Sequence, residues 1–168
     1  MLKETTIEEK AIANFLDTYV SKSKVDWSKS KFLPIKNSNN QAKGKFGEFV
    51  IKEVYNGTRV NSNGYDVETP DGWKVEVKTA FQGADGGFWF NQIYDTKNFP
   101  QKTNKDFTHL AFVFVFPDEA KAFILERPED LYDYFSTGST GNGFELKGKY
   151  NNLCKKLNNH WIECDLTN

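Results

Sequence analysis

The segment Thr69-Pro70-Asp71-Gly72-Trp73 constrains the fold most, because its residue types specify a tight reversal of the chain. Proline fixes φ for the first turn position, aspartate favours the second, and glycine supplies the positive φ of a G1 bulge. The sequence therefore predicts a hairpin with a three-residue loop, flanked by Thr69 and Trp73. The register that follows has three cross-strand pairs: Glu68 with Lys74, Val67 with Val75, and Asp66 with Glu76.

Three charged residues of this hairpin are expected to meet on one face. Successive side chains of a strand alternate between faces, so Glu76 and Lys78 lie on the same side. As cross-strand partners, Asp66 and Glu76 would have Cβ atoms ~4.5–5.5 Å apart, where two carboxylates repel unless a cation, a shared proton or solvent intervenes. Mg²⁺ resolves this conflict best, because it prefers oxygen ligands and is commonly held by one or two carboxylates plus a substrate phosphate. Lys78 would then orient an attacking water and stabilise charge on a phosphodiester.

Hydrophobic spacing and end signals predict the helices. Thr6-Ile7-Glu8-Glu9 has the form of a capping box, and a lysine- and serine-rich arm follows the first helix as far as residue 40. Asn56-Gly57 closes the second helix, and Pro128 starts the third. Helices are expected at residues 6 to 20, 41 to 55, 128 to 135 and 150 to 157.

The strands predict an α/β domain with a mixed central sheet flanked by helices. Leu110 to Phe116 is uniformly apolar, with Phe on one face and Val on the other, which is typical of a central strand covered on both sides. Strands are expected at residues 58 to 61, 65 to 69, 73 to 81, 110 to 116, 122 to 125 and 161 to 164, with a loop at 136 to 143. One domain is expected: residues 1 to 40 as N-terminal helix and basic arm, 41 to 125 as catalytic core, and 126 to 168 as C-terminal helices and edge strand.

Composition favours a globular protein of the cytoplasm. With 168 residues and 38% hydrophobic content, the chain suits a single domain, and fifteen phenylalanines predict an aromatic-rich core. Phe88, Trp89 and Phe90 have ring surfaces that could stack on bases, but their place beside a core strand favours the core for all three. No apolar run approaches the ~20 residues of a membrane span. Two cysteines, Cys154 and Cys164, are too few for a disulfide framework and lack the spacing of a zinc site.

Charge is unevenly distributed along the chain. The net charge of −1 argues against coating nucleic acid by charge alone. However, residues 22 to 45 hold seven lysines against one acid, and Lys147, Lys149, Lys155 and Lys156 form a second cluster. The candidate DNA contacts are Lys43, Lys45, Asn91, Gln92, Lys97 and Lys102, whose side chains suit phosphates or base edges.

Asp66, nine intervening residues and Glu76-Val77-Lys78 resemble the signature of the PD-(D/E)XK nuclease superfamily. The resemblance implies a restriction-endonuclease-like fold, in which Asp66, Glu76 and the Val77 carbonyl bind Mg²⁺ and Lys78 positions the nucleophilic water. In many members the preceding helix carries an acid that points toward the metal, and Glu48 has the matching position.

Other features of the sequence bear on this resemblance. The pattern recurs at Glu8/Lys10, Asp95/Lys97, Glu119/Lys121 and Glu145/Lys147, but only the Glu76 copy has the expected strand, turn and upstream helix. Tyr65 stands where the motif has proline. Thr96 stands where the exonuclease branch has a tyrosine after its glutamine, whereas Phe90-Asn91-Gln92-Ile93 resembles a segment of several restriction endonucleases. His109 and His160 are expected to be structural, which disfavours an HNH-type nuclease.

The sequence thus predicts a Mg²⁺-dependent endonuclease that hydrolyses double-stranded DNA, of the type II restriction kind. Cutting both strands of a symmetric site would call for a homodimer or for sequential nicking by a monomer. The alternatives are a DNA-repair nickase or junction resolvase of the same superfamily, and a DNA-binding protein that has the fold without catalysis.

Overall fold

The computed structural model of the chain describes residues 25–61, 64–93, 106–126, 135–137, 144–157 and 162–165. The helix predicted over residues 6 to 20 and most of the one predicted over 128 to 135 lie outside these ranges. Lys97, Lys102 and His160 also lie outside them.

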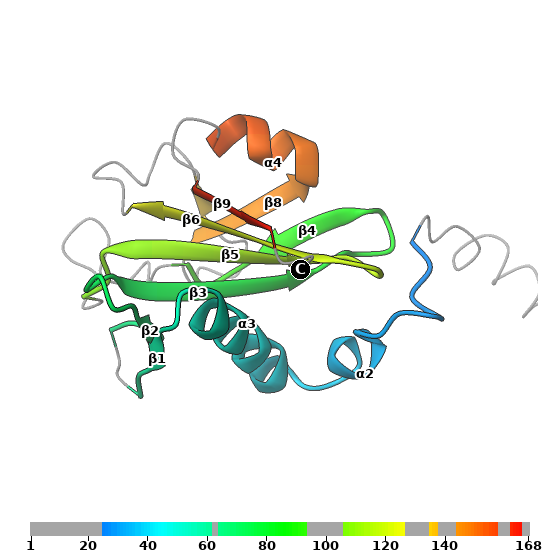
Figure 1. Ribbon diagram of the computed structural model, residues 1–168. Helices are drawn as coiled ribbons and strands as arrows, with labels where there is room; N and C mark the ends of the chain where they lie inside the picture. The colour runs from blue at the N-terminus through cyan, green and yellow to red at the C-terminus, as the bar shows by residue number, and fades with distance from the viewer. Residues whose placement is uncertain are drawn as a thin grey trace, which may run out of the picture.

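A six-stranded sheet in the order β1-β2-β3-β5-β6-β9 forms the centre of the molecule (Figure 1). Its strands are β1 (Thr58–Arg59), β2 (Val67–Glu68), β3 (Lys74–Phe81), β5 (His109–Val115), β6 (Ala120–Glu126) and β9 (Ile162–Asp165). Neighbours pair antiparallel, except that β3 and β5 are parallel. The predictions of a mixed α/β sheet, of a buried central strand at 110 to 116 and of a C-terminal edge strand are therefore confirmed.

The predicted hairpin connects β2 to β3. Gly72 has φ +82°, and the Thr69 amide donates to the Trp73 carbonyl at 3.0 Å. Val67 pairs with Val75 and Glu68 with Lys74, which confirms two of the three predicted pairs; β2 begins at Val67, so Asp66 lies just outside this pairing.

Helix α3 (Asn40–Val54) lies on one face of the large sheet (Figure 1), close to the predicted limits of 41 to 55. The Asn39 side chain caps its start by accepting a hydrogen bond from the Ala42 amide at 2.8 Å. At its end Asn56 has φ +50°, and the Gly57 amide donates to the Lys52 carbonyl at 2.8 Å, as in a Schellman motif. Asn56-Gly57 thus ends the helix as predicted.

The segment before α3 is more ordered than the irregular arm that the lysines and serines predict. A short helix, α2 (Leu33–Lys36), precedes α3, and Trp27 and Phe32 are partly buried against the core. The Trp27 and Phe81 ring centroids lie 5.9 Å apart. The prediction of an irregular arm is therefore wrong for residues 33–36, which form α2, and aromatic anchors dock this basic segment onto the sheet.

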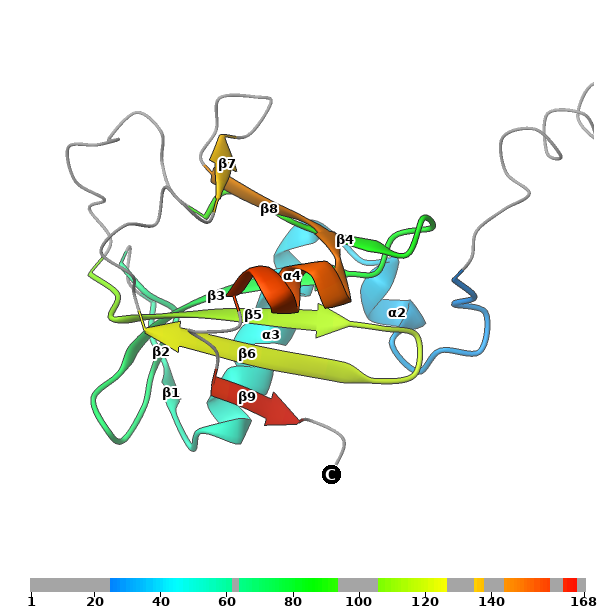
Figure 2. The same ribbon diagram turned by 90° about the horizontal axis from the view of Figure 1, so that it is seen from above.

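A small second sheet covers the other face of the large one, as Figures 1 and 2 show. It has the order β4-β8-β7, with β4 (Gly87–Phe90), β8 (Phe144–Lys149) and β7 (Ser136–Thr137), and α4 (Tyr150–Leu157) follows β8. Strand β8 was not predicted, and Ser136–Thr137 pairs with it instead of belonging to a loop. Helix α4 has its predicted limits.

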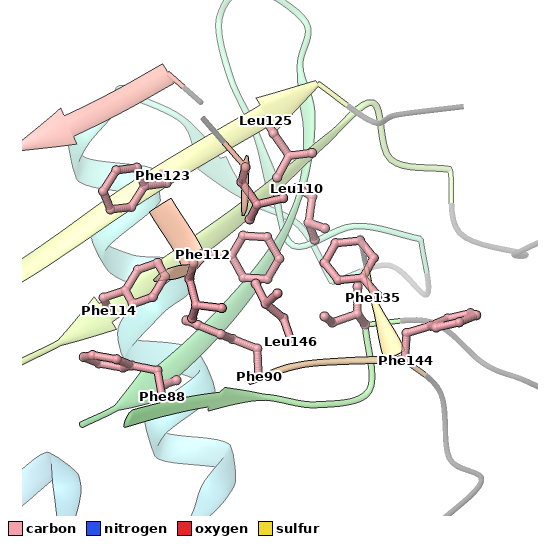
Figure 3. Close-up of a cluster of buried hydrophobic side chains, with 14 of the residues drawn as sticks. Phe88, Phe90, Leu110, Phe112, Phe114, Phe123, Leu125, Phe135, Phe144 and Leu146 are labelled. Carbon is pink, nitrogen blue, oxygen red and sulfur yellow. The ribbon is translucent and has the colours of Figure 1, made fainter. Parts of the chain in front are cut away.

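Strand β5 separates two apolar clusters. Its Phe112 and Phe114 pack with Phe88, Phe90 and other side chains of the small sheet and α4 (Figure 3). Its valines, Val113 and Val115, pack on the opposite face, in the cluster that contains Ile51 of α3 and the valines of β3. The predicted Phe and Val faces are confirmed. None of the helices in the described ranges has the length and apolar character needed to cross a membrane.

Candidate active site

The site begins where β2 separates from β3. The Asp66 amide donates to the Val75 carbonyl at 2.9 Å, which is the last backbone hydrogen bond between the two segments in the described chain. One step further along β3, the Val77 amide donates to Asp66 Oδ2 at 2.8 Å. The carboxylate therefore takes the position of a strand carbonyl, and the Val77 carbonyl, which points to the same edge as its amide, lies beside it.

Glu76 and Lys78 lie side by side on one face of β3, as period two predicts. The Lys78 Nζ atom lies 2.9 Å from Glu76 Oε1, and the two side chains are only 18% and 6% exposed. A carboxylate buried to this degree needs a partner to offset its lost hydration. Lys78 supplies this partner, and the pair holds the Glu76 side chain in place on β3.

The surroundings of Asp66 disfavour the ionised form of its carboxyl group. Burial, followed by the negative charge of Glu76, raises the pKa of Asp66 to about 6, and Glu48 adds to the rise. The Val77 hydrogen bond and the charge of Lys78 act in the opposite direction on this pKa. The fold thus brings the predicted acids together closely enough to conflict, which is what a cation would relieve.

Glu48 reaches this region from α3 because Gly47 lets the helix approach β3. A Cβ atom on Gly47 would lie 1.8 Å from Thr79 Oγ1, so a larger residue would push the helix away. Arg59 of β1 binds Glu48 Oε2 through both Nε, at 2.9 Å, and Nη2. Sequence reasoning missed Arg59, because an arginine in a two-residue strand gives no signal of its partner.

The donor set fits Mg²⁺ better than a metal that needs a full protein cage. No three His, Cys, Asp or Glu side chains of the described ranges are grouped so that they could hold a metal ion by themselves. Mg²⁺ needs less from the protein, since waters and substrate phosphate complete its shell. Asp66, Glu76 and the Val77 carbonyl offer two carboxylates and one neutral oxygen, whereas Arg59 already binds Oε2 of Glu48.

A basic cleft of about 940 Å³ adjoins these acids. It follows β3 from Val77 to Phe81 and continues onto β4, β8 and the start of α3. Its lining contains one acid, Asp85, and five lysines: Lys36, Lys43, Lys78, Lys147 and Lys149. Lys78 lines this cleft and also pairs with Glu76. A polyanion bound in the cleft would therefore lie next to the carboxylates.

Three of the predicted DNA-contacting residues line the cleft. Lys43, Asn91 and Gln92 line it, whereas Lys45 is exposed on α3 outside its lining. Trp89 also lines the cleft and is 51% exposed, so the prediction that it belongs to the core is wrong. Phe88 and Phe90 are buried, and alternation along β4 places the residue between them on the opposite face.

The histidine within the described ranges has a structural environment. His109 is nearly buried at the start of β5, and its ring stacks on Trp73 with centroids 4.1 Å apart. Burial lowers the pKa of His109, with a smaller opposing effect from Glu126. A neutral, stacked imidazole agrees with the structural reading of this residue.

In comparisons with known proteins, no family model matches this chain, and no curated protein sequence matches it. The assignment of a function therefore depends on the chemistry of the residues described above.

Proposed function

We propose that this protein is a Mg²⁺-dependent DNA endonuclease of the PD-(D/E)XK, restriction-endonuclease-like kind, which hydrolyses phosphodiester bonds of double-stranded DNA. One observation carries the proposal: where β2 leaves β3, a partly buried Asp66 with a raised pKa lies beside Glu76, which pairs with Lys78. A solvent-exposed charged face would bury none of these groups.

Each of these residues would have a distinct role. Asp66, Glu76 and the Val77 carbonyl would hold Mg²⁺, and Glu48 would help to hold it or a second ion. When bound, Mg²⁺ supplies Lewis-acid polarisation of the phosphate and a more acidic water. The Lys78 ammonium, 2.9 Å from Glu76 Oε1, would orient the attacking water and offset negative charge on the phosphate as the bond breaks.

The adjoining cleft supports a nucleic-acid substrate. Five lysines against one acid form a surface suited to phosphates, although the whole chain carries a net charge of −1. Sequence-specific cutting of both strands at a symmetric site would call for a homodimer, as in type II restriction enzymes. A monomer that cuts one strand would instead act as a repair nickase or a junction resolvase.

Incubation of the purified protein with unmethylated phage DNA, with Mg²⁺ or with EDTA, tests the proposal. We expect cleavage only with Mg²⁺: discrete bands indicate a restriction enzyme, and a smear indicates a nonspecific nuclease. Asp66→Ala and Lys78→Ala should each lower the cleavage rate about 100-fold or more while DNA binding is largely retained. Lys155→Ala, an exposed lysine of α4, is the matched control and should cleave normally.

Two results would contradict this function. The first is full DNA binding without cleavage at any Mg²⁺ concentration, which would indicate a DNA-binding protein that lacks catalysis. The second is unchanged cleavage by folded Asp66→Ala, with folding verified by thermal melting.

A further inference from the structure

We propose that the basic cleft binds the scissile strand as a locally single-stranded segment, with Trp89 stacked on one of its unpaired bases. This inference rests on the proposed function and deepens it, because cutting an intact duplex does not require any base to leave the helix. The inference specifies which form of DNA the site binds.

Trp89 is an exposed aromatic side chain among the lysines that line the cleft. Its indole Nε1 donates to Glu145 Oε2 at 2.8 Å, and Lys147 Nζ lies 5.3 Å from the ring centroid. Both partners come from β8, where Lys147 is the direct cross-strand neighbour of Trp89. These contacts fix the ring while half of the side chain stays exposed to the cleft.

An exposed ring in this position matches an unpaired base better than a paired one. In an intact duplex each base is stacked between its neighbours, so only its edges are accessible in the grooves. Proteins that bind single strands combine a basic groove with aromatic rings on which bases stack, each stack contributing about 1–3 kcal/mol. The cleft joins both elements: lysines for the phosphates and Trp89 for a base.

The lysines also define a path that reaches the acids. Lys36 and Lys43 come from α2 and α3 on one face of the large sheet, and Lys147 and Lys149 come from the small sheet on the other (Figure 1). A strand that contacts both pairs must cross β3 beyond Lys74 and Val75, the two residues that pair with β2, and Lys78 lies in that part of β3. The backbone of that strand would therefore pass beside Glu76 and Asp66.

Binding without cleavage isolates this inference. In EDTA, the anisotropy of a short fluorescent oligothymidylate and of a blunt duplex of equal length would be measured with each variant. We expect Trp89→Ala to weaken oligothymidylate binding about tenfold or more and to leave duplex binding unchanged. Trp89→Tyr, which retains a stacking ring, should keep most of the affinity for the single strand.

Phe49→Ala is the matched control for the loss of an exposed aromatic side chain. Phe49 is 54% exposed and has Lys52 Nζ 5.6 Å from its ring centroid, but it lies on α3 outside the cleft. This variant should bind both DNA forms normally. Equal weakening of both forms by Trp89→Ala, or no weakening of either, would overturn the inference.

The two proposals fail in different ways. Absence of Mg²⁺-dependent cleavage, with a tenfold effect of Trp89→Ala on the single strand, would remove the nuclease and support the strand-binding cleft. Cleavage of duplex DNA that is insensitive to Trp89→Ala, with no binding of oligothymidylate, would remove the single-strand inference and leave the nuclease.

Discussion

Asp66 Oδ2 accepts the Val77 amide hydrogen at 2.8 Å, so a side chain completes a ladder that the backbone of β2 no longer continues. This single contact fixes one carboxylate oxygen and directs the other away from the Val77 amide. It also places the acid beside the Val77 carbonyl and near Glu76. This position suits a bound cation. Without one, the buried negative charge lowers the free energy of unfolding, and the first two predictions follow from that loss of stability.

Asp66→Asn should stabilise the protein in EDTA at pH 8. Asparagine keeps an oxygen for the Val77 amide but removes the buried negative charge. The folded protein binds the proton of the Asp66 carboxyl more tightly than the unfolded chain does. Ionisation of Asp66 therefore lowers the free energy of unfolding as pH rises from about 4 through about 6. After allowance for solvent screening, we expect a gain of about 1–2 kcal/mol, or several degrees in Tm.

The pH dependence of this gain is its internal check. At about pH 3, below both the unfolded pKa of 3.8 and the folded pKa of about 6, Asp66 and its replacement are both neutral, so the difference in unfolding free energy between the two proteins should nearly vanish. Asp118→Asn, an exposed acid in the turn between β5 and β6, is the control and should melt like the parent at either pH. A destabilised Asp66→Asn protein at pH 8 would mean that the charge is not strained.

Cleavage at subsaturating Mg²⁺ should fall below pH 6, by about tenfold for each pH unit. The proton and the cation compete for the same carboxylate, and the pKa of Asp66 is raised to about 6 by burial and by Glu76. Single-turnover rates measured across pH at several Mg²⁺ concentrations test this. The midpoint should move to lower pH as Mg²⁺ increases, whereas a midpoint independent of Mg²⁺ would assign the titration to another group.

Local signals explain what the sequence predicted well. The hairpin register follows from five consecutive residues, 69 to 73, whose backbone preferences act without help from the rest of the chain. The central strand follows from an uninterrupted apolar run. Once both are known, Asp66, Glu76 and Lys78 have little freedom to lie apart.

The features that were missed depend on contacts between distant segments. Arg59 and Glu48 are eleven residues apart and meet only because α3 and β1 pack against the same hairpin. The alternation of Phe144 and Leu146 with charged residues was a usable signal for β8, but a Gly/Ser-rich loop precedes it. Trp89 was assigned to the core because hydrophobicity alone does not reveal which side of β4 is covered.

Gly47→Ala and Gly44→Ala should change stability in opposite directions. A Cβ on Gly47 would collide with Thr79 Oγ1, whereas a Cβ on Gly44 would meet nothing within 4 Å. We expect Gly47→Ala to cost about 1–3 kcal/mol through overpacking, and Gly44→Ala to gain about 0.5–1 kcal/mol through lower chain entropy. Urea denaturation measures both free energies of unfolding. Gly47→Ala should also slow cleavage, because it moves the helix that carries Glu48; equal stability of the two variants would show that α3 does not need this close approach.

The double variant Lys147→Ala/Lys149→Ala should weaken DNA binding and flatten its dependence on salt. Each phosphate contact contributes about 0.7 to the slope of log affinity against log salt for a single strand, and about 0.9 for a duplex. Lys149 lies 3.9 Å from Asp85 Oδ2, so part of its charge is already compensated. We therefore expect the slope to fall by more than about 0.7 but by less than about 1.4, which is the value for two free lysines on a single strand. Lys155→Ala/Lys156→Ala removes the same charge from α4, outside the cleft lining, and should leave the slope nearly unchanged. If both pairs change the slope equally, net charge governs binding, and the cleft has no special part in it.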